Sequence, residues 1–320
     1  MKSACRYRPS IRVGFRNADP GGGGPQLPRP RGAPTRSRGG LIVCRWMAYL
    51  GNPINVGSVM FRQRANTIVH QSLDASQGAE PVNGDGFGLG WFSPDTGKPT
   101  RYRSTEPAWN DENLREIAET LESGAFIAHV RAAIGSPVQQ SNCHPFRHGG
   151  TLFVHNGFVR DFHRIKRDVV LRIDPELYPS IVGSTDSEHL FYLALTFGLH
   201  DDPQAALERA VGCVEALAAR ARIDDPVQMT IGALTKDALV AARYATRAVP
   251  RTLYHSNDIP TLKRLYPDFE DLQMLPGDAR AIMSEPLGAL PGAWSEVPVS
   301  TAVHVSRAGL DLRPFSPRHD

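Results

Sequence analysis

Residues 39–53 read GGLIVCRWMAYLGNP, a stretch that looks like the beginning of a protein although it lies about forty residues into the chain. Before Cys44 the chain has no hydrophobic period. From Cys44 onward, apolar residues recur at the spacing of helices and strands. We therefore expect one folded domain over residues 44–320.

The distribution of charged residues changes at the same position. Residues 1–43 carry eight Arg and one Lys against a single acid, Asp19, and they hold eight Gly and six Pro. This composition buries too little apolar surface to offset the entropy of ordering, so we expect the segment to be disordered. The net charge of +3 leaves −5 on the remaining 277 residues, so the positive total is no argument for a nucleic-acid partner.

The sequence carries no sign of export or membrane insertion. No window reaches the roughly 18 apolar residues of a membrane span, and no apolar core of a secretory signal follows the basic residues. The cysteines lack pairing or metal spacing, which suits a reducing compartment; they are Cys5, Cys44, Cys143 and Cys213. We expect a cytoplasmic protein with no membrane partner.

The order of the expected elements indicates the fold class. Apolar patterns predict strands at 89–94, 100–104 and 125–133, and a strand at 150–159 that is broken at Asn-Gly. They also predict a hairpin over 229–246 and late strands at 279–287 and 301–312. Helical spacing predicts helices over 110–123, 184–199 and 203–222. Strands in adjacent antiparallel pairs and helices in a block fit an α+β fold, with two sheets packed face to face and helices outside.

The segment VHNG (154–157) is a candidate for oxyanion binding. The Asn156 amide and the Gly157 N–H can converge on one point, and glycine permits a close backbone approach that a Cβ would obstruct. Two neutral donors are what a tetrahedral intermediate of acyl transfer needs. The alternative is a plain turn, because Asn-Gly is the strongest short hairpin signal.

Arg131 and Asp186 are candidates for gripping an amino acid. Arg131 interrupts an apolar strand, and Asp186 stands at a helix start. A guanidinium binds a carboxylate bidentately, and a carboxylate binds an ammonium. The alternatives are an edge-strand arginine paired with a surface acid and a simple helix cap.

Cys44 is the candidate nucleophile. A thiol with a pKa of about 8.5 is mostly protonated at neutral pH and needs a base. If Cys44 were the first residue, its α-amine, with a pKa of about 7.7–8.0, would be that base. Val43 is what an internal GTG start codon becomes when translation begins further upstream. We expect residues 1–43 to be absent from the mature protein, either as a mis-assigned extension or as a cleaved propeptide.

Taken together, the motifs resemble those of a known family. VCRWMAYLG (43–51) is similar to the opening Met-Cys-Arg-x-x-x-Tyr-Leu-Gly of the stand-alone class II, or N-terminal-nucleophile, glutamine amidotransferases, which include the ergothioneine-pathway γ-glutamyl amidohydrolases. NGDGFGLGWF, AHVRAA, NCHPF, VHNG and STDSE then follow in family order. The resemblance covers about residues 44–306.

The resemblance implies a fold and a catalytic set. The implied fold is a four-layer αββα sandwich. Cys44 matches the nucleophile, and Asn156 and Gly157 match the oxyanion hole. The implied reaction is cleavage of a γ-glutamyl amide through a Cys44 thioester, without metal or cofactor.

The resemblance also implies a substrate-binding set. Arg131 matches the residue that holds the α-carboxylate, Asp186 the residue that holds the α-amine, and His144 a residue lining the glutamine pocket. Members with a fused synthase often have Trp and Thr where this chain has Ala132 and Ile134. The expected partner is glutamine or a γ-glutamyl small molecule, with water or a separate ammonia-accepting subunit as acceptor.

Two other functions fit parts of the sequence. One is a binding protein that keeps the amidotransferase fold while its amine is blocked by residues 1–43. The other is a metallohydrolase. Its ligands would come from His129, His144, His148, His155, Asp186 and His189.

Overall fold

The computed structural model describes residues 44–62, 66–73, 82–133, 135–288 and 290–319. The expectations for residues 1–43, including disorder and removal, lie outside the described residues, as does Ile134.

The opening stretch forms the middle strand of a seven-stranded antiparallel sheet, sheet A. Its order is β11 (Trp294–Glu296), β9 (Tyr254–Ser256), β10 (Arg280–Met283), β1 (Arg45–Asn55), β4 (Glu122–Val130), β2 (Phe87–Phe92) and β3 (Pro99–Ser104). Residues 45–51 of β1 are all buried, because the strand has a neighbour on each side and side chains packed on both faces.

A second sheet, sheet B, is formed from residues 146–245 and 301–314. Its order is β13 (Gly309–Pro314), β12 (Thr301–Ser306), β8 (Ala238–Ala245), β7 (Val227–Leu234), β6 (Thr151–Val159) and β5 (Phe146–His148). All neighbouring strands are antiparallel. β5 pairs with β6 only as far as Phe153, so the far end of β6 has no described strand on that side.

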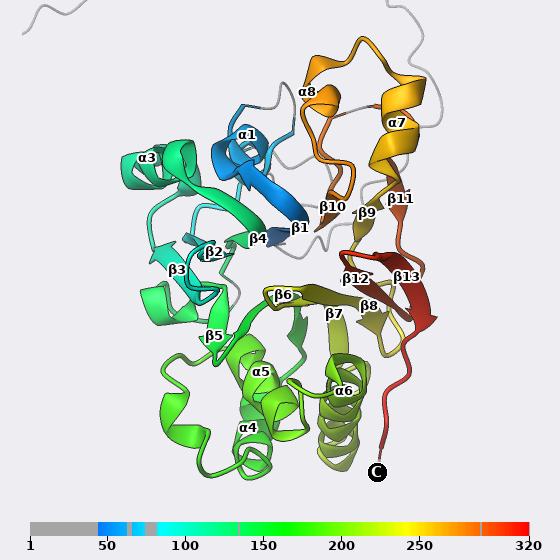
Figure 1. Cartoon of the computed structure of the whole chain (residues 1–320). Helices are drawn as coiled ribbons and strands as arrows, with labels where there is room; N and C mark the ends of the chain where they lie inside the picture. The colour runs from blue at the N-terminus through cyan, green and yellow to red at the C-terminus, as the bar shows by residue number, and fades with distance from the viewer. Residues whose placement is uncertain (1–43, 63–65, 74–81, 134, 289, 320) are drawn as a thin grey trace, which may run out of the picture. The chain divides into compact units, whose positions relative to one another are not determined.

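Helices cover the outer face of each sheet (Figure 1). Sheet A carries α1 (Val56–Met60), α2 (Ile68–Leu73), α3 (Glu112–Thr120), α7 (Ile259–Leu265) and α8 (Glu270–Gln273). Sheet B carries α4 (Phe162–Val170), α5 (Asp186–Thr196) and α6 (Pro203–Arg220). Short 3-10 turns lie at Ala108–Asn110, Gln140–Asn142 and Tyr178–Ser180. This is the expected four-layer αββα sandwich.

The inner core lies between the two sheets. Alternate residues of β1, Trp46, Ala48 and Leu50, point into it and meet Val154 of β6 and Leu234 of β7. The Trp46 indole also donates a 3.0 Å hydrogen bond to the Thr230 hydroxyl of β7. Burial of these side chains stabilises the packing of the two sheets by roughly 25 cal/mol per Å² of apolar surface.

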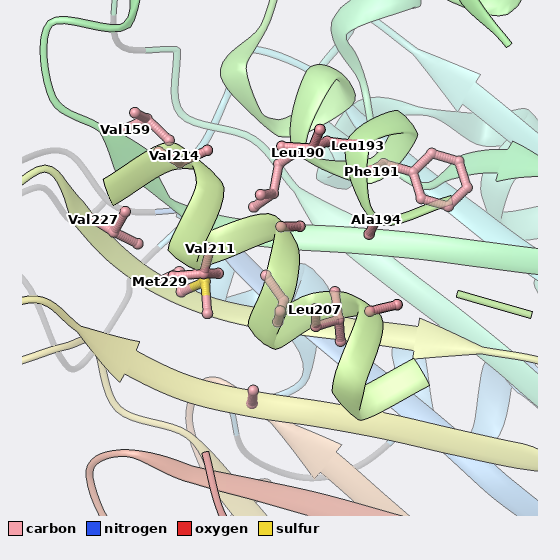
Figure 2. Close-up of a cluster of buried hydrophobic side chains, with 14 of the residues drawn as sticks. Val159, Leu190, Phe191, Leu193, Ala194, Leu207, Val211, Val214, Val227 and Met229 are labelled. Carbon is pink, nitrogen blue, oxygen red and sulfur yellow. The ribbon is translucent and has the colours of Figure 1, made fainter. Parts of the chain in front are cut away.

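A second core layer joins sheet B to its helices (Figure 2). Leu190 and Phe191 of α5, Val211 of α6 and Met229 of β7 belong to one buried cluster. The Phe191 ring stacks on Phe153 of β6, with centroids 5.0 Å apart. The α6 helix begins with Pro203 at its first position and an Asp202 cap that accepts from Ala205 N. These local signals explain why the expected range of 203–222 lies so close to the observed one.

Several expected elements differ from the structure. The 301–312 strand is a hairpin, β12 and β13, that turns at Arg307 and Ala308. The 279–287 strand is shortened to β10, and the cap of α3 is Asp111 rather than Asn110. These local boundaries are set by hydrogen bonds that the apolar pattern alone does not reveal.

None of the helices within the described residues is long and apolar enough to cross a membrane.

Candidate active site

Cys44 lies directly before β1, where the middle strand of sheet A begins. Arg45 is opposite Val130 of β4, so Cys44 is level with the residues that follow β4. Its Sγ lies 3.4 Å from both the backbone nitrogen and the carbonyl oxygen of Ala132. The thiol is therefore held at the end of two neighbouring strands.

Opposing charges act on this thiol. Burial raises the pKa of Cys44, and the Asp186 carboxylate raises it further. The Ala132 hydrogen bond and the charges of Arg131 and Arg45 lower the same pKa. Because burial is the largest of these effects, the resting group is a thiol that needs a base to become a nucleophile.

Arg131 directly follows β4 and is buried. Its guanidinium donates to the Asp85 carbonyl (3.2 Å), the Ser136 hydroxyl (2.7 Å) and the Pro137 carbonyl (3.2 Å). The Asp85 carboxylate in turn accepts from Ala133 N at 2.8 Å. All three acceptors are neutral, so these contacts leave the positive charge of the guanidinium available to a bound carboxylate.

Asp186 is the first residue of α5, with Thr185 as the helix cap. Its carboxylate accepts from Val159 N at 2.6 Å and from Ser187 N at 2.8 Å. The first contact ties the start of α5 to the end of β6. Because a carboxylate offers about four acceptor positions, lone pairs remain for a ligand ammonium.

The Asn156-Gly157 pair lies inside β6 rather than at a turn. β6 continues to Val159, and Asn156 is opposite Thr230 of β7, the residue that accepts from the Trp46 indole. The Asn156 side chain is buried, and within the described residues its Nδ2 has no hydrogen-bond partner. A buried amide donor without a partner is costly unless a ligand uses it.

Gly157 has φ +156°, and a Cβ there would lie 2.0 Å from the Gln228 carbonyl and 2.8 Å from the His155 ring. Gly157→Ala is therefore expected to lower the free energy of unfolding by about 3 kcal/mol or more, because the backbone of β7 must move. Urea denaturation measures this difference. Gly150→Ala is the control, since nothing lies within 4 Å of its Cβ position. Equal stability of the two variants would contradict the steric argument.

His144 lies beside the site, among other aromatic rings. Its ring stacks on His129 of β4, with centroids 4.2 Å apart, and contacts Phe146 at 4.5 Å. Burial holds the pKa of His144 well below its usual range, and burial together with Arg131 lowers that of His129 to about 3. Within the described residues neither nitrogen of His144 has a hydrogen-bond partner. Among the described side chains, no hydrogen bond or ring contact joins His144 to Cys44.

The histidines of the alternative metal site are dispersed over several elements. In the part of the chain that the structure describes, no group of three or more His, Cys, Asp or Glu side chains could hold a metal ion. The His155 ring instead contacts the Ser187 hydroxyl at 2.8 Å, and the His189 ring contacts the Thr185 carbonyl at 2.7 Å.

Three side chains outside the predicted catalytic and substrate-binding set support the site. Arg45 forms a fully buried ion pair with Glu285, which follows β10, and donates to the Cys44 carbonyl at 3.1 Å. Asp85 fixes the segment after Arg131. Charged residues inside the apolar stretches of residues 44–50 and 281–287 are the signals that could have identified Arg45 and Glu285.

An apolar cavity of about 380 Å³ lies away from this site, under α7 and α8. It is lined by side chains such as Val59, Leu262, Leu272 and Trp294 on the outer face of sheet A. None of the candidate catalytic or substrate-binding residues lines it.

Comparisons of this chain with family models and with known proteins indicate the same family. The family model "Glutamine amidotransferases class-II" matches residues 60–220. The probable glutamine amidotransferase DUG3 of Saccharomyces cerevisiae is 29% identical over 302 residues, 85% of this chain and 84% of that protein. The γ-glutamyl-hercynylcysteine sulfoxide hydrolase of Mycolicibacterium smegmatis is 35% identical over 118 residues, 37% of this chain and about half (52%) of that protein.

Solved structures are similar over most of the chain. A glutamine aminotransferase class-II domain protein from Silicibacter pomeroyi has a TM-score of 0.63 at 28% identity, covering 86% of this chain and all of the other. Glutamine phosphoribosylpyrophosphate amidotransferase from B. subtilis has a TM-score of 0.56 at 16% identity, covering 86% of this chain and 50% of the other. The second likeness concerns the fold alone. The expected fold class is confirmed.

Proposed function

Because the chain belongs to the class II glutamine amidotransferases, we propose that it hydrolyses a γ-glutamyl amide through a thioester on Cys44. The substrate is glutamine or a γ-glutamyl conjugate, and the products are glutamate and ammonia or a free amine. The names of two relatives, a glutamine amidotransferase and a γ-glutamyl-hercynylcysteine sulfoxide hydrolase, support a γ-glutamyl substrate.

One observation carries this proposal: Cys44 Sγ lies 3.4 Å from the backbone of Ala132, the residue next to Arg131, and the charges of Arg131 and Asp186 both lie close enough to shift the pKa of the Cys44 thiol. Cys44, Arg131 and Asp186 come from distant parts of the sequence, yet they are within electrostatic reach of one another. A guanidinium suits an α-carboxylate, and a carboxylate suits an α-ammonium. A γ-glutamyl group carries both, with a reactive carbonyl at the far end of its side chain.

In the proposed reaction the Cys44 sulfur attacks the δ-carbonyl of the substrate. The Asn156 amide, buried and without a partner among the described residues, and the Gly157 N–H would stabilise the oxyanion. Collapse breaks the C–N bond and leaves a γ-glutamyl thioester. Water then attacks the thioester, which releases glutamate and regenerates the thiol.

The proton transfers require a base next to the sulfur. Burial raises the pKa of the thiol, and the nearby carboxylate of Asp186 already has two backbone donors. An α-amine on Cys44 itself would accept the thiol proton and pass it to the leaving nitrogen. We therefore propose that the active form begins at Cys44 and lacks residues 1–43.

The test is an assay of glutamate release from glutamine and from a γ-glutamyl anilide, with and without hydroxylamine. We expect the active form to release glutamate from both substrates. We also expect it to form γ-glutamyl hydroxamate when hydroxylamine competes with water for the thioester. The full chain and the form that begins at Cys44 are assayed side by side. Release of neither glutamate nor hydroxamate by either form would overturn the proposed function.

A further inference from the structure

A third arginine, besides Arg45 and Arg131, lies close to the nucleophile and has no assigned role. Arg251 belongs to the segment between β8 and β9, and its side chain is half-buried. Only its backbone carbonyl is bonded, by Arg243 Nε at 2.8 Å. Among the residues that the structure describes, no side chain or carbonyl forms a hydrogen bond or ion pair with the Arg251 guanidinium. Its nitrogens are also not among the fully buried ones, so a ligand can reach them.

Hydrogen bonds tie this segment to the start of β1. The hydroxyl of Thr252, the next residue, donates to the Ser284 carbonyl at 2.9 Å. Ser284 N donates to the Trp46 carbonyl at 2.9 Å, and its hydroxyl accepts from Trp46 N at 3.1 Å. Trp46 is two residues from Cys44. Two steps of hydrogen bonding therefore fix the segment of Arg251 beside the nucleophile.

Arg131 and Arg251 approach Cys44 from opposite sides of β1. β4 is the neighbour of β1 on one side and β10 on the other (Figure 1). Both strands run antiparallel to β1, so both end level with its start, and Arg131 directly follows β4. Ser284 directly follows β10 and holds the segment of Arg251. Arg131 and the segment of Arg251 therefore flank the start of β1, next to Cys44.

The charges around Arg251 favour an anion. Burial and the neighbouring charge of Arg45 lower its pKa, and Cys44 raises it. Glu285, the acid of this region, is already paired with Arg45. Among the described residues no acid pairs with Arg251 itself, so a bound carboxylate would supply the missing negative charge.

We propose that Arg251 binds a carboxylate on the leaving group, so the preferred substrates are γ-glutamyl amino acids or peptides rather than glutamine. This inference rests on the proposed function. In a γ-glutamyl amino acid, the scissile nitrogen is attached to the carbon that bears the second carboxylate. That carboxylate lies beyond the reacting carbonyl as seen from Arg131. A guanidinium binds it with two parallel hydrogen bonds, which ammonia as a leaving group cannot use.

Binding to a Cys44→Ala variant tests this subsite without hydrolysis. The probes are γ-glutamylglycine and its C-terminal amide, which differ only in the second carboxylate. Isothermal titration calorimetry measures both dissociation constants, in the full chain and in the form that begins at position 44. We expect γ-glutamylglycine to bind about 10-fold or more tighter than the amide in at least one form, the effect typical of a hydrogen bond between charged groups.

Adding Arg251→Met to the Cys44→Ala variant is expected to reduce the ratio of the two dissociation constants to about one. The substitution should weaken the binding of γ-glutamylglycine and leave that of its amide unchanged. Arg247→Met is the matched control, because Arg247 lies in the same segment, is exposed, and should leave the ratio unchanged. Arg251→Lys should restore part of the preference, since lysine keeps the charge without the bidentate fork.

Equal affinity for the two probes in both forms, or a preference that survives Arg251→Met, would overturn the inference. A failure of the proposed function looks different. In that case the unsubstituted protein releases no glutamate from any γ-glutamyl compound, whatever the ratio of the dissociation constants.

Discussion

Cys44→Ala is expected to lower the rate of glutamate release from γ-glutamyl amides by about 10³-fold or more, to the level of the background reaction. In the proposed reaction the sulfur forms the thioester, and neither of the other two thiols among the described residues can replace it. Cys143 is buried with its own partners, and Cys213 lies in α6 on the outer side of sheet B. Loss of a nucleophile removes the covalent pathway altogether. The measurement is kcat for glutamate release under saturating substrate.

Cys213→Ala is the matched control and should retain full activity. Folding of Cys44→Ala is checked by thermal unfolding. We expect little change because, within residues 44–319 as described, the hydrogen bonds of Cys44 Sγ are two long ones, both to Ala132. A Cys44→Ala protein that keeps more than about a tenth of the activity would refute the thioester pathway.

Activity is also expected to depend on a free α-amine at Cys44. Retaining a single residue before Cys44 converts the amine into an amide, which cannot accept a proton, and we expect kcat to fall by about 10²–10⁴-fold. For the form that begins at Cys44, kcat/KM should decrease as the pH falls below about 8, because the amine is then protonated and no longer a base. Intact-mass measurement verifies the first residue of each preparation.

The control for this experiment is a single residue added after Asp320, which leaves the amine free. Equal activity with and without the residue before Cys44 would contradict the role of the amine. So would a fully active native protein whose mass includes residues 1–43.

Local signals in the sequence predicted the elements whose formation depends on neighbouring residues. The α6 helix has a Pro at its first position, a capping Asp202 and a continuous apolar face, so its start was predictable at residue 203. The β2–β3 hairpin was likewise predictable from two apolar runs joined by DTGK.

The Asn156-Gly157 pair is where local reasoning fails. An Asn-Gly dipeptide favours a turn by its own backbone preferences. In the structure both residues pair with β7, over an uninterrupted register from Leu152 to Val159. Eight cross-strand pairs outweigh one dipeptide preference, and the Asn156 amide remains available for a ligand as a result.

The sequence by itself determined the α+β class and, through the joint order of its motifs, the family. It also predicted a domain start at Cys44 and a set of candidate site residues. Each of these depends on composition or on residues within a few positions of one another. Only the tertiary structure decided that Arg45 pairs with Glu285, 240 residues away, and that Arg131 and Arg251 approach Cys44 from opposite sides of β1. Strand order arranges these groups, because a sheet brings together residues that no local pattern in the chain connects.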